Sequence, residues 1–421
     1  MPLHTITIKD IEFNLKHINK IVLLKKIAFF IITCVSILGI NSCGNNQQMN
    51  EIINDFENLS IIGHIDSSSG NEITVCDRHN IDQIKVFPID NLVDEIQLIQ
   101  LDSSNEDNYI SEGFVTVSDN YIGVKTSTGY KLFNKTGRFI SDIGRKGPGP
   151  EEYPFPIYDA KISESRNSIF LLPMGNGVSY IIEYDLDGNF KSRIPLAYPI
   201  NKGRMFYSDD EFTIYSLRWD NEYEPAIWTQ NRKGEVLNEI YSKITTTNPD
   251  FSNEIYVGTD SVASTANIFT FNFSLPIDTL YHIEKGNIIP QLTIEDEKVS
   301  PHLMVELKDY YLIQFFTKEN VMDAITFSPN SIIMMDKKSL KGGYIDFIIE
   351  SLGGLLFKGY ISEFSSGYFI LNLEPGDLGV LIDESIKSNP DITPQQKTKL
   401  KGIMENIDMD GNNVIIYGKF I

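Results

Sequence analysis

The sequence KLFNKTGRFISDIGRKGPGPEEY, residues 131–153, decides the fold of this chain. Apolar residues alternate over Lys131–Asn134 and again over Arg138–Ile143, with a Thr-Gly pair between the two segments. Two short alternating strands joined by a turn with glycine in second place are a strong indication of a β-hairpin. Glycine and proline dominate Gly144–Pro150, and this composition predicts a loop after the hairpin.

Similar hairpins recur along the chain at intervals of roughly 50 residues. Each has an apolar or alternating strand, a polar turn that usually contains glycine, and a return strand. The expected copies are Ile84–Leu101, Tyr180–Leu196, Ala226–Tyr241, Thr279–Ile294 and Ser331–Phe347. Further strand patterns lie between them: Phe114–Val117, Tyr121–Lys125, Ile169–Leu172, Phe212–Leu217, Ile268–Phe273 and Tyr368–Leu373. A hairpin with one or two extra strands in each repeat is typical of four-stranded propeller blades.

We therefore predict an all-β fold, a six-bladed β-propeller with four-stranded blades that spans residues 61–421. Two stacked β domains, such as sandwiches, are the alternative, but no stretch after residue 60 has the composition of an interdomain linker. The C-terminal strand Asn413–Ile421 is expected to close the ring by completing a blade that includes Ile73–Val75.

Two segments depart from the strand pattern. Thr393–Asn406 is predicted to be a short helix, because a proline suits the first turn and Ile403 and Met404 would face inward. Pro301–Lys318 has a mixed apolar pattern that fits either a helix or an insertion.

The N-terminus has the features of an export signal. A Lys-Lys pair precedes the apolar run Ile27–Ile40, which is too short to span a bilayer comfortably and fits the apolar core of a secretory signal. The run ends at Ser42-Cys43, which resembles the lipobox of bacterial lipoproteins. A plain signal peptide or an N-terminal anchor helix is the alternative.

The lipobox resemblance implies that residues 1–42 are a lipoprotein signal peptide and that Cys43 becomes the acylated first residue. Residues 43–60 are polar at their start and would form a flexible tether. The expected location is the outer membrane, on its periplasmic side or at the cell surface, with membrane contact through the lipid only. Cys34 would leave with the signal and Cys43 would carry lipid, so Cys76 would have no disulfide partner within the chain.

Composition limits the partners of the folded part. The chain has 421 residues, of which 42% are hydrophobic, enough for a large core. Its formal net charge of -21 argues against binding of nucleic acid, because phosphate backbones require clustered lysine and arginine. An envelope protein, a carbohydrate or a peptide is the expected kind of partner, and the protein is expected to be a monomer.

Residues 143–153, IGRKGPGPEEY, carry a family resemblance. They look like the signature of the six-bladed β-propeller lipoproteins of Bacteroidota, which are related in architecture to NHL-repeat propellers. The family pattern is Ile-Gly-Arg-x-Gly-x-Gly-Pro-Gly-Glu-Tyr, and Glu151 stands here where glycine is usual. The resemblance runs from about residue 60 to the end and implies a fold but no particular activity.

The signature loop supplies the candidate ligand contacts Gly144, Arg145, Gly147, Gly149, Pro150, Glu152 and Tyr153. It lacks the Gly-Lys-Ser/Thr ending and the following helix of a phosphate-binding loop. One interpretation is a crossing between blades in which Arg145 pairs with Glu151 or Glu152. The other places the loop at the mouth of the propeller, where the guanidinium fork of Arg145 would meet an anionic group.

No catalytic residue, metal site or cofactor is predicted. The six histidines show neither HxH nor HExxH spacing, and no GxSxG motif occurs. Asp185–Asn189 and Asp408–Asn412 open like calcium loops, but Leu196 and Lys419 stand where the bidentate carboxylate is needed. The aromatic residues around one blade are more often core than a sugar-stacking platform; they are Tyr215, Trp219, Tyr223 and Trp228.

These observations leave two functions open. The first is a lipid-anchored envelope propeller that binds a ligand or a protein at the mouth of the ring. The second is a propeller hydrolase or lyase with a metal in its central channel. A channel mouth lined by aromatic and neutral polar groups favours binding, whereas histidines or carboxylates that converge on the channel favour the enzyme.

Overall fold

A computed structural model describes residues 56–421, apart from 69, 82–83, 111–112, 220–223, 248–250, 259–264, 272–278, 285, 296–299, 322–323, 358, 362–363, 366 and 390–391. The predicted signal peptide, Cys43 and most of the predicted tether lie outside the described residues. Phe56 and Leu59 fall within the range expected for the tether, yet both are buried, and the Phe56 ring packs on Phe87 and Tyr310.

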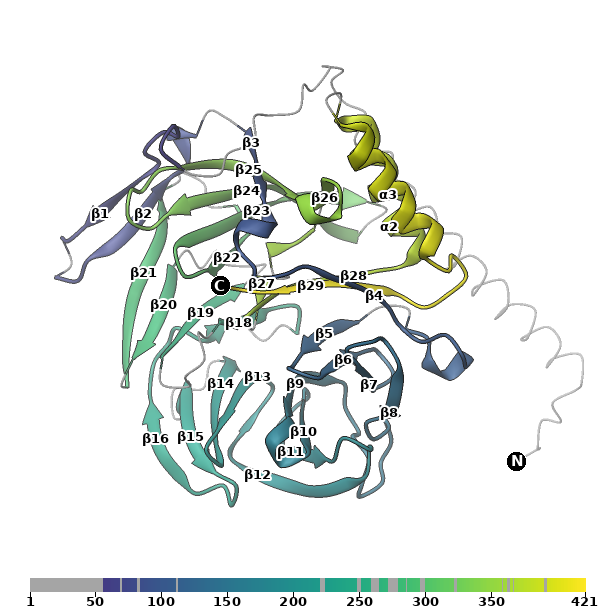
Figure 1. Ribbon diagram of the computed structural model, residues 1–421. Coiled ribbons are helices and arrows are strands. Elements are labelled where there is room, and N and C mark those ends of the chain that lie inside the picture. Colours follow the sequence, from purple (N-terminus) through teal and green to yellow (C-terminus); the bar gives the residue numbers. More distant parts are fainter. Residues whose placement is uncertain are drawn as a thin grey trace, which may run out of the picture. The chain divides into compact units, whose positions relative to one another are not determined.

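Six small sheets form the blades of a six-bladed β-propeller (Figure 1). The first blade holds β5 (Phe114–Val117), β6 (Tyr121–Lys125), β7 (Tyr130–Asn134) and β8 (Phe139–Asp142). The second holds β9 (Ile157–Ser163), β10 (Ser168–Pro173), β11 (Val178–Tyr184) and β12 (Phe190–Ile200). The third holds β13 (Lys202–Ser208), β14 (Glu211–Trp219), β15 (Ile227–Asn231) and β16 (Val236–Ile240).

The fourth blade holds β18 (Glu254–Gly258), β19 (Thr265–Phe271), β20 (Thr279–Glu284) and β21 (Asn287–Glu295). The fifth holds β22 (His302–Glu306), β23 (Tyr310–Val321), β24 (Ala324–Asp336) and β25 (Gly342–Ile349). The sixth holds β27 (Phe364–Ser365), β28 (Tyr368–Leu373), β29 (Val414–Lys419) and β4 (Gln97–Gln100). The prediction of a six-bladed, four-stranded propeller is confirmed.

Short strands extend the sheets of three blades. The hairpin of β1 (Gly63–Asp66) and β2 (Ile73–Asp77) joins the fourth blade through parallel pairing of β2 with β21. In the fifth blade, β25 pairs in parallel with β3 (Ile84–Pro88) and antiparallel with β26 (Leu355–Phe357). In the third, β17 (Thr246–Thr247) lies parallel to β14. These additions leave fewer unpaired strand edges open to other chains.

Five of the six predicted hairpins are the third and fourth strands of a blade, β7–β8, β11–β12, β15–β16, β20–β21 and β24–β25. The hairpin predicted at Ile84–Leu101 is wrong. Its first half is β3, which pairs with the fifth blade, and its second half is β4, which pairs with the sixth. A short 3-10 helix at Ile89–Asn91 separates the halves, so each strand finds a distant partner rather than its neighbour.

The C-terminal strand closes the ring, as predicted. Strand β29 runs antiparallel to β4, with Tyr417 opposite Gln97 and Val414 opposite Gln100. The partner expected for it, Ile73–Val75, was wrong, because that segment is β2 and pairs with β21 of the fourth blade. The outer strand of the sixth blade thus comes from the start of the ring and the other three from its end (Figure 1).

The helix predicted at Thr393–Asn406 is confirmed as α3 (Pro394–Asn406), and its N-terminus is closed by a capping box between Thr393 and Gln396. Leu400 is its fully buried residue, with Ile403 and Met404 partly buried beside it. A second helix, α2 (Pro375–Ser388), escaped the sequence analysis and buries Leu378 and Ile382 against the core. Pro301–Lys318 is neither helix nor insertion, since it supplies β22 and most of β23.

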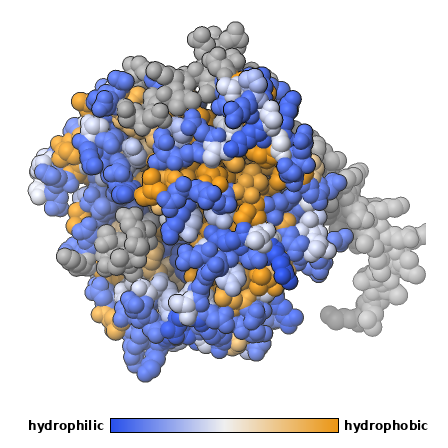
Figure 2. All heavy atoms as spheres, in the orientation of Figure 1, coloured by the Kyte–Doolittle hydropathy of each residue, from blue (hydrophilic) through white to orange (hydrophobic). Residues whose placement is uncertain are grey.

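The core lies between neighbouring sheets. Trp228 and Tyr215 are fully buried there, which confirms the core interpretation for those two, while Tyr223 lies outside the described residues. Burial of such a large side chain stabilises the fold by about 1.5–3 kcal/mol. The face in Figure 2 is covered mostly by hydrophilic residues, with apolar residues visible in several patches. In the described part of the chain, no helix combines the length and the apolar character needed to cross a bilayer.

Candidate functional site

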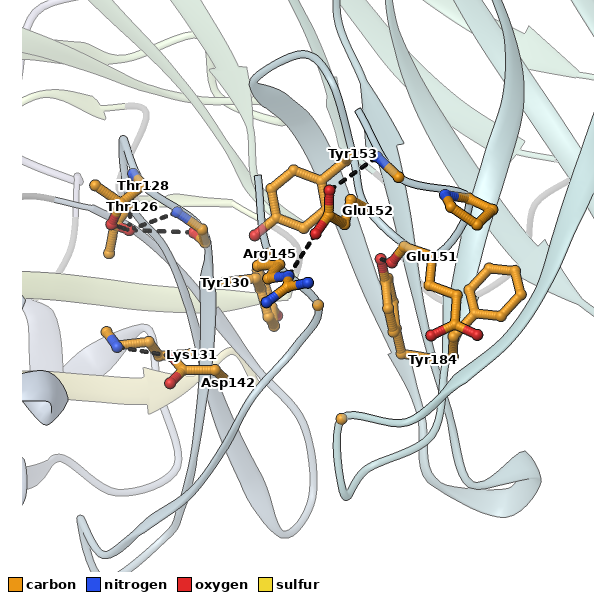
Figure 3. A pocket seen from close by; sticks show the side chains of 16 residues that line it. Thr126, Thr128, Tyr130, Lys131, Asp142, Arg145, Glu151, Glu152, Tyr153 and Tyr184 are labelled. Carbon is orange, nitrogen blue, oxygen red and sulfur yellow. Dashed lines mark hydrogen bonds and ion pairs between the residues drawn. The ribbon is translucent and has the colours of Figure 1, made fainter. Parts of the chain in front are cut away.

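The signature loop carries the chain from β8, the outer strand of the first blade, to β9, which begins the second. Its centre is the carboxylate of Glu152 (Figure 3). Oε1 of Glu152 accepts a hydrogen bond from Nε of Arg145 at 2.5 Å, and Oε2 accepts one from the backbone N–H of Gly149 at 2.8 Å. The Gly149 N–H, and then Arg145, hold the pKa of Glu152 below its usual range. The predicted pairing of Arg145 with Glu152 is therefore present.

Three glycines of the loop stand where a side chain would collide with a neighbour, two of them with this carboxylate. A Cβ added at Gly147 would lie 2.1 Å from Oε2 of Glu152, and one added at Gly149 would lie 2.9 Å from it. Gly144 has a φ of +62°, and a Cβ there would lie 2.4 Å from the ring of Tyr184. All three distances are shorter than the contacts that real Cβ atoms make, so the close approach favours glycine at each position.

The end of the loop is held by the buried side chain of Tyr153 and by backbone hydrogen bonds. Tyr153 is buried, its N–H donates to the carbonyl of Arg145 at 3.1 Å, and its carbonyl accepts from the N–H of Gly147 at 3.1 Å. Oη of Tyr184 donates to the carbonyl of Glu151 at 2.7 Å, so Glu151 takes part through its backbone. The φ of Glu151 is not positive, and the loop therefore accommodates a glutamate at this position.

A cavity of about 600 Å³ opens beside the loop, between the first and second blades (Figure 3). Pro150 and the aromatic rings of Tyr184 and Phe190 line it. Its two lining cations are paired with carboxylates, Arg145 with Glu152 and Lys131 with Asp142 at 2.7 Å. The side chain of Arg145 is 82% exposed, but an anion would compete there with Glu152. Ligand contact by this loop stays a prediction.

A second cavity, of about 1320 Å³, is the central channel of the propeller. Residues of β5, β9, β13, β18, β22 and β27, the first strand of each blade, line it. We use the name channel mouth for the end at which these strands begin. Six lining residues define it: Phe114, Lys125, Tyr158, Arg204, Tyr256 and Tyr360.

Tyr158 lies at the centre of the polar groups of the channel mouth. Its hydroxyl donates to Oε2 of Glu254 at 2.5 Å and accepts from the N–H of Ile255 at 3.2 Å. The other oxygen of Glu254 accepts from Nζ of Lys202 at 2.7 Å. Lys202 is only 2% exposed and also donates to the carbonyls of Phe251 and Asn253. Burial raises the pKa of the Tyr158 phenol well above its usual value, so the phenol is neutral.

Arg204 lies over the aromatic ring of Tyr158. Its Cζ is 4.6 Å from the centroid of the Tyr158 ring, and its Nε donates to the carbonyl of Ile255 at 3.0 Å. Its NH1 group is 3.6 Å from Oδ1 of Asp159, whose other oxygen accepts the N–H of Met205 at 2.9 Å. Arg204 is thus held by stacking and by one carboxylate, with part of its guanidinium facing the channel.

Lys125 ends β6 and reaches the mouth from the first blade. Its Nζ donates to the carbonyl of Tyr158 at 3.0 Å and lies 4.2 Å from the ring centroid of Phe114. Burial, and then the positive charge of Arg204, lower the pKa of Lys125 to about 8. Among the described residues, no carboxylate oxygen lies within ion-pair distance of this amine.

Two exposed aromatic rings line the channel mouth with these charges. Phe114 is 71% exposed although it lines the channel, and Tyr360 is 43% exposed. The phenol of Tyr360 lies close enough to contribute to the raised pKa of Tyr256. Exposed rings next to a cation can stack a flat ligand while the charge binds an anionic group.

The opposite end of the channel has a different character. Asp119, Glu164 and Glu306 line it together with Lys308 and Lys419. Glu164 accepts hydrogen bonds from Ser118 and Asn120, and Glu306 is bound by His282 and Lys337. In the described ranges, no three His, Cys, Asp or Glu side chains gather in a way that could hold a metal ion. The polar groups of this end serve the contacts between strands.

The residues of the channel mouth were not identified from sequence. Phe114 and Lys125 were recognised as members of adjacent strands, but a strand pattern does not say which end of which strand lines a channel. Strand β9 contains Tyr158, Asp159 and Lys161, which are too many polar side chains for a strand buried in a core. That composition could have marked β9 as a strand that lines the channel.

Comparison with known proteins finds one family and several solved structures that resemble this chain. A family described as "Domain of unknown function (DUF4934)" matches residues 72–419. A solved structure from Bacteroides fragilis, named as a candidate exported protein, is 12% identical with a TM-score of 0.51, and the match covers 78% of this chain and 95% of that one. A Bacteroides caccae protein of unknown function is 10% identical with a TM-score of 0.34, covering 59% and 93%. No curated protein matches the chain in sequence.

Proposed function

Because this chain belongs to the family described as "Domain of unknown function (DUF4934)" and folds as a six-bladed propeller, we propose that it is a lipid-anchored binding module of the bacterial cell envelope. The ligand enters the central channel at its mouth. The observation that carries this proposal is the exposure of the Phe114 ring beside Lys125, in a channel of about 1320 Å³. Water-exposed aromatic rings that line a cavity are typical of ligand sites.

Binding is favoured over hydrolysis or elimination by how the carboxylates are used. Asp159 and Glu254, the acidic groups near the mouth, are both engaged by neighbouring N–H, N–H₃⁺ or O–H groups. A general acid or base needs a proton-transfer partner in reach of the substrate, and these two carboxylates have their oxygens turned to the protein. The described residues of the mouth thus supply contacts rather than a proton-transferring pair.

The envelope location is supported by the N-terminal sequence. The basic pair, the apolar run Ile27–Ile40 and Cys43 follow the order of a lipoprotein signal. The Bacteroides fragilis protein of similar fold is itself named as a candidate exported protein. A lipid on Cys43 would hold the propeller at a membrane while the propeller itself makes no membrane contact.

Ligand binding is tested by replacing Phe114, whose ring is exposed and contributes little to the core. The full mature protein, purified in mild detergent, is mixed with a small-molecule extract of bacterial envelopes, and its thermal unfolding is followed. We expect the extract to raise the Tm of the wild type and of the control Tyr241→Ser, an exposed aromatic away from the channel lining. Phe114→Ser should abolish the increase. An equal increase in Phe114→Ser, or none in the wild type, contradicts the proposal.

Lipid attachment is tested in living cells. Cells that express the full chain are fed labelled palmitate, and the protein is fractionated between membrane and soluble pools. Cys43→Ala should lose the label and leave the membrane pellet, while Cys34→Ala, within the apolar run, should keep both. Label that survives in Cys43→Ala would exclude this anchor.

A further inference from the structure

The channel mouth carries an excess of positive charge in a strongly acidic protein. Four cationic side chains lie on the strands at and below the mouth, and two carboxylates face them, Asp159 and Glu254. The cations are Lys125, Lys161, Lys202 and Arg204. The difference between four and two leaves two uncompensated positive charges, while the whole chain has a net charge of -21. A local charge of the opposite sign to the protein indicates a site for a charged partner.

The two carboxylates cannot neutralise that excess. Glu254 binds Lys202 with one oxygen and the Tyr158 hydroxyl with the other. Asp159 accepts the backbone N–H of Met205 and lies within 4 Å of both Arg204 and Lys161. One carboxylate is therefore shared by two cations, and Lys125 has no carboxylate partner among the residues that the structure describes.

The cations are held in place by the aromatic core of the mouth. Around the ring of Tyr158, the ring-centroid distances are 4.6 Å for Cζ of Arg204, 5.2 Å for Nζ of Lys202 and 5.8 Å for Nζ of Lys125. The three cations come from two strands of different blades, β6 and β13, and Tyr158 comes from β9 between them. Charges positioned by the fold before the ligand arrives cost little conformational entropy on binding.

An apolar surface adjoins the least compensated cation. The Phe114 ring is 4.2 Å from Nζ of Lys125 and is mostly exposed. Within the described part of the chain, the amine makes one hydrogen bond to protein, to the Tyr158 carbonyl, although an ammonium group has three donors. A ligand with a flat ring on Phe114 can place an anionic group where the remaining donors of Lys125 reach it.

We propose that the channel mouth binds a small organic anion in which a carboxylate or sulfonate group sits next to a flat apolar ring. Lys125 is the main contact of the anionic group, Arg204 is the second, and Phe114 stacks on the ring. This inference rests on the proposed function, since it assigns the class of ligand to the same channel. The opposite end of the channel is less suited to an anion, because the three carboxylates of Asp119, Glu164 and Glu306 line it together with the two lysines Lys308 and Lys419.

The test uses two fluorescent probes that differ by one charge, anilinonaphthalene sulfonate and its uncharged parent phenylnaphthylamine. Both are titrated into the full mature protein. We expect Lys125→Gln to weaken binding of the sulfonate by roughly tenfold to a hundredfold, as for the loss of a charge-assisted hydrogen bond. Its binding of the uncharged parent should change less than about twofold. Lys125→Arg keeps the charge and should retain most of the affinity for the sulfonate.

The signature-loop cavity supplies the matched control. Lys131→Gln removes a lysine that lines that cavity and pairs there with Asp142, so it should leave the binding of both probes unchanged. A loss of sulfonate binding in Lys131→Gln, with none in Lys125→Gln, would move the anion site to the loop and overturn the proposal. Thermal unfolding of each variant shows that it is folded before binding is measured.

The dependence on pH gives an independent readout. The charged groups that face Lys125 are Arg204 and Lys202 of β13, Asp159 of β9 and Glu254 of β18. Because the pKa of Lys125 is lowered to about 8, the sulfonate should bind roughly tenfold to thirtyfold more weakly at about pH 9.5 than at about pH 7. Lys125→Arg should remove this dependence. An unchanged affinity of the wild type over that range contradicts the role of Lys125.

The outcomes separate this inference from the proposed function. If Phe114→Ser weakens both probes but Lys125→Gln affects neither, the channel binds ligands and the preference for anions is wrong. If neither probe binds, or Phe114→Ser affects neither probe, the inferred class of ligand is wrong, and the proposed function is then decided by the extract test with Phe114→Ser.

Discussion

At the scale of single residues, the signature loop is a device for holding one carboxylate. Glu152 binds the N–H of Gly149 and the Arg145 side chain, and the closest approach to it is made by Gly147. The Gly-x-Gly spacing of Gly147 and Gly149 is therefore a consequence of packing a carboxylate against the backbone. The repeated glycines need no bound phosphate to explain them.

Gly147→Ala tests this account of the loop. The new Cβ would lie 2.1 Å from Oε2 of Glu152, so the carboxylate must move and weaken its bonds to Arg145 and Gly149. We expect the free energy of unfolding to fall by about 1–3 kcal/mol, measured by urea denaturation. Gly402→Ala in α3 is the control, because nothing lies within 4 Å of its added Cβ and alanine favours a helix by up to about 1 kcal/mol. Equal stability of Gly147→Ala and wild type would refute the packing explanation.

At the scale of elements, a titratable contact joins two neighbouring blades. Nε2 of His282, on β20, is 2.5 Å from Oε2 of Glu306, on β22, and Nζ of Lys337 is 2.6 Å from Oε1. Burial lowers the pKa of His282, but the hydrogen bond and charge of Glu306 outweigh it, and the net shift is upward. Burial raises the pKa of Glu306, and its bonds to His282 and Lys337 reverse this to a net decrease. The charged pair is thus the favoured form.

The sign of each shift defines a pH window. The raised pKa of His282 gives stability that is complete below its unfolded pKa of about 6.5 and is lost as the pH rises through the folded pKa. The lowered pKa of Glu306 gives stability that is complete above its unfolded pKa of about 4.5 and is lost as the pH falls through the folded pKa. The contact between the fourth and fifth blades is therefore strongest near pH 5–6.5.

We expect this window to be visible in thermal unfolding. The difference in Tm between wild type and His282→Gln should be largest near pH 6 and should shrink toward pH 9. His64→Gln, a substitution of a histidine on the edge hairpin β1–β2, serves as the control for histidine replacement in general. A difference that does not change with pH would mean that His282 contributes only by packing.

At the scale of the whole molecule, stability depends on closure of the ring between β4 and β29. Ile416 of β29 is fully buried and stands between Leu371 of β28 and Leu98 of β4. Closure removes two sheet edges that would otherwise expose unpaired backbone groups. The strand therefore ties the end of the propeller to its beginning.

Ile416→Ala tests how much the closing strand contributes. Loss of a buried isoleucine side chain to alanine costs about 2–5 kcal/mol, and we expect the main thermal transition of the propeller to move down as a whole. Lys419→Ala lies on the same strand but is exposed, and surface changes of this kind stay within about 0.5 kcal/mol. A separate early transition in Ile416→Ala, with the main one unmoved, would show that the sixth blade opens independently.

The sequence alone was enough for features made by residues close together in the chain. Five hairpins, the capped helix α3 and the ion pair of Arg145 with Glu152 each join residues within about one repeat, so local pattern and turn chemistry predict them. The hairpin of β22 and β23 within Pro301–Lys318 is local, and its mixed apolar pattern did not reveal it. Only the tertiary structure decided the contacts between distant segments: the pairing of Gln97 with Tyr417 and the parallel partner of β3. The channel mouth belongs to the second kind. Lys125, Tyr158 and Arg204 are unremarkable in their own strands and meet only because β6, β9 and β13 belong to three consecutive blades around one channel.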